Sequence, residues 1–215
     1  MRNLLTIVLL GTVSITMANI GKYEEAMLKN IEALYKSKSL EEYQKVINTM
    51  DRIATAEADK WEPYYYGSFG NIMMSTRVTE LADKDKLLDA AQHRLDKASA
   101  IQAGNVEIIT LQGFIHMMRL AADPATRGQQ YAGLAFETFN KAVAIDSLNP
   151  RALIMRAQMM QGTAKFFGTS MTESCGEAQK ALDQFDSSEK PKNPLAPIWG
   201  RGNAVGMLKE CDDNE

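Results

Sequence analysis

From Gly21 onward, apolar residues recur every three to four positions, and no segment shows sustained alternation of apolar and polar residues. This spacing predicts amphipathic helices, because a strand with one buried face would alternate instead. The expected helices span about 22–37, 40–58, 64–78, 84–103, 106–121, 129–146, 151–166, 174–186 and 196–210. The connections between them are short, so consecutive helices are expected to pack as antiparallel hairpins.

Two of these helices begin with a sequence that is typical of a capping box. Ser39 and Ser174 each precede a glutamate by three residues, at Glu42 and Glu177. In a capping box the hydroxyl accepts a hydrogen bond from the glutamate amide, and the carboxylate bonds back to the serine amide. The motifs therefore predict helices that begin directly after Ser39 and Ser174.

Small residues repeat along the chain in two interleaved series that share one period. The first series has intervals of 43, 44 and 43 residues and consists of Gly70, Gly113, Ala157 and Gly200. The second series has intervals of 44 and 43 residues and consists of Ala91, Ala135 and Ala178. A shared period of this length indicates a stack of helical hairpins, in which small residues let paired helices approach closely.

Both series resemble the tetratricopeptide repeat (TPR). The second helix of that repeat has a small–x3–large–x2–small pattern, as in Ala135, Phe139 and Ala142, and the 22-residue spacing to the next small residue also matches. The chain departs from the family inside each repeat, where 21 to 22 residues separate the two small positions and the family has about twelve. The extra residues fall between the two helices of a repeat, as longer helix ends or as loops such as residues 123–128.

The resemblance covers about residues 60–210 and implies an all-α fold. The expected architecture is a TPR-like right-handed α-solenoid of about four helical hairpins. One hairpin cannot bury its apolar face alone, whereas stacked hairpins form a continuous core. The last predicted helix, 196–210, is expected to act as the C-terminal cap that such arrays require.

Residues 1–18 have the pattern of a secretory signal peptide, and residues 19–215 are expected to form the repeat domain. Arg2 precedes an apolar stretch from Leu4 to Val13, and the small residues Thr16 and Ala18 stand at the positions read by a signal peptidase. The apolar stretch is shorter than the roughly eighteen residues of a membrane span. We therefore expect a periplasmic or secreted protein with no membrane span after cleavage.

The net charge and the histidine and cysteine content limit which ligands and cofactors the chain can bind. Lys and Arg number 24 against 27 Asp and Glu, a net charge of −3, so no basic field is available for nucleic acid. His93 and His116 lack partners at metal-ligand spacing, so we expect no metal and no cofactor.

Cys175 and Cys211 stand at the start of one helix and the end of its expected antiparallel neighbour. In an exported protein this placement predicts a disulfide between them.

No catalytic arrangement is recognisable, since the chain has neither a phosphate-binding glycine loop nor a CxxC motif. We therefore expect a protein that is not an enzyme. In the TPR family the first helices line a concave groove, and the resemblance maps that groove onto positions that mix apolar and polar side chains, as in an adaptable peptide-binding surface. These positions are Tyr64, Asn71, Met74, Glu107, Thr110, Phe114, Met117, Arg151, Ile154, Gln158 and Gln161.

The signal-peptide pattern and the resemblance together predict an exported protein that binds a peptide segment of a protein partner through its concave helical face, in an envelope complex. Two alternatives remain open. The first is binding of a carbohydrate or another small ligand, with ring stacking from Tyr64 and Phe114. The second is self-assembly, in which the groove or an end helix pairs with another copy of the chain.

Overall fold

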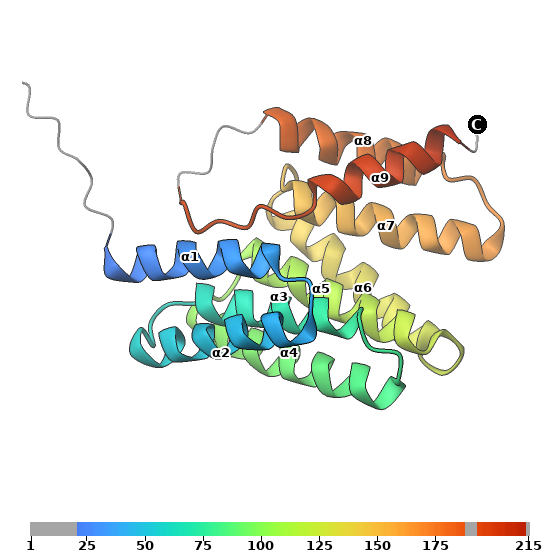
Figure 1. Cartoon of the computed structure of the whole chain (residues 1–215). Coiled ribbons are helices and arrows are strands. Elements are labelled where there is room, and N and C mark those ends of the chain that lie inside the picture. The colour runs from blue at the N-terminus through green and yellow to red at the C-terminus, as the bar shows by residue number, and fades with distance from the viewer. Residues whose placement is uncertain (1–20, 188–192, 214–215) are drawn as a thin grey trace, which may run out of the picture.

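The computed structural model describes residues 21–187 and 193–213, and all regular structure within these ranges is helical (Figure 1). The helices are α1 (Lys22–Lys36), α2 (Leu40–Ala56), α3 (Glu62–Ser75), α4 (Leu81–Ile101), α5 (Val106–Ala122), α6 (Pro124–Ile145), α7 (Pro150–Phe167), α8 (Thr172–Ser187) and α9 (Arg201–Asp212). The all-α prediction is confirmed. The signal peptide predicted for residues 1–18 lies outside the described residues.

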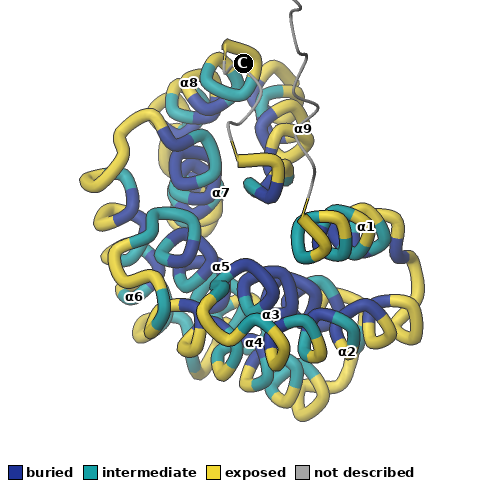
Figure 2. The backbone as a smooth tube through the Cα atoms, turned by 90° about the vertical axis from the view of Figure 1, so that its left-hand side faces the viewer, coloured by how far each residue is buried: buried dark blue, intermediate teal, exposed yellow. Residues whose placement is uncertain are grey.

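The helices form a curved stack with an inner and an outer row. Each odd-numbered helix contacts the next odd-numbered one, from α1 through α3, α5 and α7 to α9. Among the described residues, the even-numbered helices contact only their odd-numbered neighbours. Figure 2 shows α3, α5 and α7 on the inside of the curve, with α1 and α9 facing each other across it. We call this inner side of α3, α5 and α7 the concave side.

The repeating small residues lie where helices approach most closely. A Cβ atom at Gly113 of α5 would lie 2.3 Å from Cε1 of Phe139 on α6, and one at Gly70 of α3 would lie 2.9 Å from Cγ1 of Ile47 on α2. Phe139 is fully buried. The close packing that the 43-to-44-residue period predicts is therefore present between the paired helices.

The extra length of each repeat is mainly helical. α6 begins at Pro124, so residues 124–128, expected as part of a loop, belong to the helix. Asp123 caps this helix by accepting a hydrogen bond from the amide of Thr126, and proline is well suited to a first helical turn, where its missing N–H costs nothing. The repeats are therefore elongated hairpins with short turns.

One of the two predicted capping boxes is present. Ser39 and Glu42 make both of its hydrogen bonds at the start of α2. The prediction at Ser174 is wrong, because α8 begins two residues earlier and Ser174 lies inside it. Glu177 binds the guanidinium of Arg156 on α7 instead, with an Nε–Oε1 distance of 2.5 Å. A tertiary ion pair has replaced the local motif.

Candidate functional site

Residues 193–200 form a non-helical segment between α8 and α9 that crosses the concave side, and we call it the strap (Figure 2). It begins with a turn, in which the amide of Ala196 donates to the carbonyl of Asn193 at 3.0 Å. The sequence predicted a helix from residue 196, which is wrong, since α9 begins at Arg201. Pro194 and Pro197 cannot donate helical backbone hydrogen bonds, and Gly200 has a φ of +108°, which L side chains rarely adopt. The strap therefore stays non-helical until Gly200 starts the last helix.

The strap brings a tryptophan into a group of aromatic rings from three other helices. The ring of Trp199 stacks on Phe69 of α3, with centroids 5.5 Å apart and an interplanar angle of 22°. It also lies 6.0 Å from the ring of Phe114 on α5, at 33°. Tyr35 of α1 packs against Phe69, with ring centroids 6.0 Å apart. The group that we call the aromatic cluster consists of Tyr35, Tyr65, Tyr66, Phe69, Phe114 and Trp199.

Three tyrosine hydroxyls of this cluster bind the strap. The hydroxyl of Tyr66 donates to the carbonyl of Leu195 at 2.7 Å. The hydroxyl of Tyr65 accepts from Nε1 of Trp199 at 2.9 Å, and that of Tyr35 accepts from the amide of Ile198 at 3.4 Å. The cluster thus combines apolar ring faces with hydroxyl groups that bind two backbone groups and the indole N–H of the strap.

The cluster is electrically neutral. Burial raises the pKa of Tyr35 to about 12, and burial also raises the pKa values of Tyr65 and Tyr66 well above their usual range. A buried phenol favours its neutral form because the phenolate loses its hydration. All three hydroxyls therefore stay protonated near neutral pH and keep a proton to donate.

A nearly buried ion pair lies next to the end of the strap. Nε of Arg151 on α7 lies 2.6 Å from Oε2 of Glu107 on α5, and the two side chains are 13% and 12% exposed. Burial disfavours the charged form of Arg151, but the hydrogen bonds and charge of Glu107 outweigh it, so the pKa of Arg151 is raised. This guanidinium holds α5 to α7 and is already satisfied by a carboxylate.

The expected open groove is largely closed. Six of the expected groove residues are buried, so the expectation of an open groove is wrong for them: Asn71, Met74, Thr110, Phe114, Ile154 and Gln161. The inner helices contact neighbours on several sides, and the strap and α9 cover part of the face that the sequence left open. The hydroxyl of Thr110 has no hydrogen-bond partner among the described residues.

Two predicted groove residues, Tyr64 and Asn71, contact side chains of α4. Tyr64 lies under Nζ of Lys97 on α4, at 5.6 Å from the ring centroid, and Asn71 accepts a hydrogen bond from Arg94, also on α4. Tyr64 and Phe114 therefore contact different parts of the molecule, and the structure does not bring them together as a stacking pair for a sugar.

Two further predicted groove residues, Met117 and Gln158, are partly buried. Oε1 of Gln158 accepts a hydrogen bond from Asn203 of α9 at 3.3 Å. Tyr35, Phe69 and Trp199 were not among the predicted site residues, although the tryptophan close to two prolines was a visible signal.

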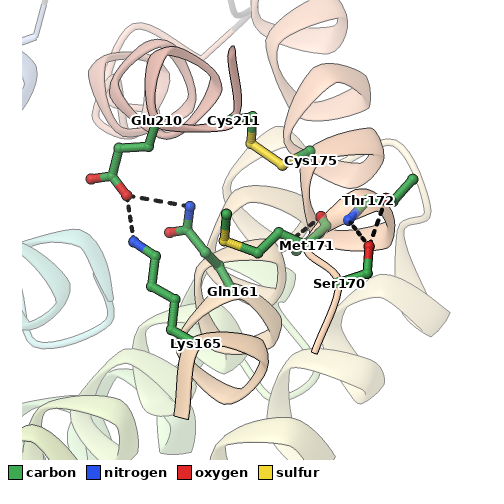
Figure 3. Close-up of a disulfide and its surroundings, with 9 residues drawn as sticks. Gln161, Lys165, Ser170, Met171, Thr172, Cys175, Glu210 and Cys211 are labelled. Atoms are coloured by element: carbon green, nitrogen blue, oxygen red, sulfur yellow. Dashed lines mark hydrogen bonds and ion pairs between the residues drawn. A yellow bond between two sulfur atoms is a disulfide. The ribbon is translucent and has the colours of Figure 1, made fainter. Parts of the chain in front are cut away.

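The predicted disulfide between Cys175 and Cys211 is present and joins the start of α8 to the end of α9, with the two Cα atoms 6.1 Å apart (Figure 3). On the other side of α9, Glu210 binds Nζ of Lys165 at 2.5 Å and Nε2 of Gln161 at 3.4 Å. Disulfides persist in oxidising compartments. The bond ties the last helix in place beyond the strap.

Comparisons with known proteins bear on the fold. No known protein-family model matches the chain, and no curated protein matches it in sequence. Its structure is similar to that of the HusA haemophore from Porphyromonas gingivalis, with a TM-score of 0.79 and 25% sequence identity over 92% of this chain and 96% of that one. It is also similar to a thermophilic TPR protein of Thermus thermophilus, with a TM-score of 0.59 and 14% identity over 89% and 90% of the two chains. The chain has a TPR-like helical repeat fold.

Two other surface features of this TPR-like protein lie apart from the aromatic cluster. A pocket of about 310 Å³ lies between α4, α5 and α6. Its lining includes the charged residues Asp96, Glu137 and Lys141 and the apolar residue Leu95. At the C-terminal end of α7, Phe166 and Phe167 are 82% and 70% exposed and contact each other edge to face. The aromatic cluster differs from both because it joins segments from opposite ends of the chain.

The two histidines lie outside the aromatic cluster. His93 is exposed on α4, whereas His116 is half-buried and lies 3.1 Å from Nε2 of Gln112. Among the described residues, no group of three His, Cys, Asp or Glu side chains is arranged to hold a metal ion. No helix in residues 21–187 or 193–213 is both long enough and apolar enough to span a membrane.

Proposed function

We propose that this protein is an exported, non-enzymatic TPR-like binding protein whose ligand is a flat aromatic molecule of the haem class. The ligand would bind on the concave side, against the faces of Phe69 and Phe114. The proposal combines two elements: a haemophore is similar to almost the whole chain, and an aromatic cluster lies at the centre of the concave side.

The observation that carries the proposal is the likeness to the haemophore, at 25% identity over 92% of this chain. The predicted signal peptide and the Cys175–Cys211 disulfide support an oxidising location outside the cytoplasm, where a carrier of this kind would act. A preformed helical solenoid supports such a role because it presents a rigid surface, so little entropy is lost on binding.

The chemistry of the aromatic cluster suits a tetrapyrrole. Phe69 and Phe114 already hold one planar aromatic group, the indole of Trp199, at stacking distance. Tyr65 and Tyr66 place two neutral hydroxyls beside these rings, and hydroxyls can donate to the carboxylate groups that porphyrins have. Apolar faces with a few fixed polar groups are typical of small-molecule sites.

Iron coordination by histidine is not part of the proposal. His116 follows Phe114 by two residues, which on a helix is about 200° around the axis, so the two side chains point in nearly opposite directions. His116 accordingly contacts Gln112 and Tyr131, away from Trp199. A site built on stacking alone should bind metal-free porphyrin about as well as haem.

The test is a titration of the chain without residues 1–18 with haemin and, separately, with protoporphyrin IX, followed by visible absorbance. Both ligands should bind saturably and with similar affinity. Replacing Phe114→Leu should weaken binding about two- to tenfold, since an aromatic contact contributes roughly 0.5–1.5 kcal/mol beyond area burial.

The matched control removes aromatic rings from a different surface. The double variant Phe166→Ala/Phe167→Ala deletes the exposed pair at the end of α7 and should bind both porphyrins like the unaltered chain. Loss of porphyrin binding in this variant would instead place the ligand site at that end of α7. Absence of saturable binding to either porphyrin would refute the proposed ligand class.

A second candidate function is recognition of an extended peptide from a protein partner. It is favoured by one observation, that the concave side already holds a non-helical, proline-containing segment through Tyr66 and Leu195. Several peptide-binding domains likewise bind proline-containing segments on aromatic-lined surfaces. A protein partner would be retained on immobilised protein and released by excess peptide of residues 193–200, whereas protoporphyrin IX would show no saturable binding.

A further inference from the structure

The strap occupies the surface to which the proposed ligand would bind. The indole of Trp199 lies against both Phe69 and Phe114, the two rings proposed to hold the ligand. Leu195 is 4% exposed and buries its side chain in the core beside this position. A planar ligand and the indole cannot occupy the same faces at once.

The strap is held by buried residues and by hydrogen bonds: Leu195, Pro197 and Gly200 are buried, whereas Asn193, Pro194 and Ile198 are exposed. Its polar contacts with the inner helices are the hydrogen bonds to Tyr35, Tyr65 and Tyr66, and the first of these is long, at 3.4 Å. Ile198 is 65% exposed, so a central residue of the strap adds little buried apolar area. A short non-helical segment of mixed burial opens at a lower free energy than the helices that form the core.

The surroundings of the strap allow it to leave without unfolding the end of the chain. The Cys175–Cys211 disulfide fastens the far end of α9, and Glu210 binds Lys165 of α7, so α9 keeps its own attachments. Gly200 lies at the junction of strap and helix with a φ of +108°, a backbone region that glycine enters freely. The strap can therefore move as a loop between two anchored helices.

We propose that the strap is an internal occupant of the ligand site, which the ligand displaces. This inference rests on the proposed function and adds its regulation. In the closed state Trp199 fills the space between Phe69 and Phe114, and in the open state the ligand takes its place. The hydroxyls of Tyr65 and Tyr66, released from the strap, then donate to the carboxylates of the ligand. The apparent affinity is the intrinsic affinity reduced by the fraction of molecules whose strap is open.

The test compares two truncations in the strap. Leu195→Ala removes a buried anchor that the open state does not use, so it should raise the affinity for protoporphyrin IX about tenfold or more. Ile198→Ala is the matched control, because it makes a similar truncation at a side chain that is 65% exposed, and its affinity should equal that of the unaltered chain. Circular dichroism would establish that both variants keep their helices.

If Leu195→Ala binds protoporphyrin IX no more tightly than the unaltered chain does, the inference is overturned. The ligand would then bind with the strap in place. A second arm needs no porphyrin and uses a fluorescein-labelled peptide of residues 193–200. The peptide should bind Leu195→Ala at concentrations up to about 1 mM, the effective concentration of a short tether, and should not bind the unaltered chain.

The two arms separate the inference from the proposed function. If neither protein binds porphyrin but the peptide binds only Leu195→Ala, the ligand class is wrong and the strap is still an occupant that can be displaced. If the peptide binds neither protein and porphyrin affinity does not rise, the strap is a fixed part of the fold and the inference fails.

Discussion

Replacing Gly113 by alanine should destabilise the protein, although alanine is the better helix former. Gly113 lies inside α5, where the propensity difference alone would stabilise the protein by about 1 kcal/mol. The new Cβ, however, would lie 2.3 Å, 2.6 Å and 2.9 Å from three ring atoms of Phe139. Ordinary van der Waals contact requires at least 3.4 Å.

The magnitude follows from the confinement of the ring. Phe139 is 0% exposed and is enclosed between α5 and the remainder of the core, so it cannot move aside freely. Overpacking of this kind costs about 3 kcal/mol at the upper end of its usual range. After the gain in helix propensity, Gly113→Ala should lower the free energy of unfolding by about 2 kcal/mol. For a chain of this size the melting temperature should fall by about 4–8 °C.

Gly133→Ala provides the matched control. Gly133 also lies inside a helix, α6, but an added Cβ would meet nothing within 4 Å. Only the propensity gain then remains, and the variant should be more stable by up to about 1 kcal/mol. Thermal unfolding followed by circular dichroism would measure both variants. A Gly113→Ala variant as stable as Gly133→Ala would refute the assignment of Gly113 to a close helix–helix approach.

Two further predictions concern the disulfide and pH. Replacing both cysteines by serine should lower the free energy of unfolding by about 4 kcal/mol in the chain-entropy model, given the 36-residue separation, and an unchanged urea midpoint would contradict this. Burial, together with the charge of Arg119, lowers the pKa of His116, so the unfolded chain binds that proton more readily. The free energy of unfolding should therefore fall as pH drops from about 7 to about 5, and His116→Gln should reduce this loss in urea titrations at each pH. An identical pH dependence of the two proteins would show that His116 does not contribute.

Part of the site was predictable from the sequence, and the disulfide shows why. Cys175 and Cys211 lie on consecutive helices of an expected antiparallel pair, so their proximity follows from local topology. The repeat pattern assigns a face to each position of the first helices and so selected Phe114, which is buried but contacts Trp199 in the aromatic cluster. Met74 was placed on the same face and is also buried, because α3 packs against α1, α2, α4 and α5.

The errors at helix ends have a similar cause. The sequence correctly located a helix start at Ser39, where the capping groups lie within one turn. It misplaced the start of α8, because Glu177 binds Arg156 of another helix instead of capping its own. It also extended the last helix over Pro197, although proline interrupts helical hydrogen bonding, and so the strap was not predicted.

By itself, the sequence determined the helical content, the hairpin repeat and the pairing of the cysteines. These features depend on side-chain periodicity and on contacts between neighbouring helices, which a chain specifies through short spacings. Only the tertiary structure decided that the strap covers the concave side. The hydrogen bonds that place it join residues 129, 134 and 163 positions apart, from Tyr66, Tyr65 and Tyr35 to the strap. Contacts across such separations depend on the curvature of the solenoid, which brings α1 and α3 to the strap, and no local sequence pattern specifies them.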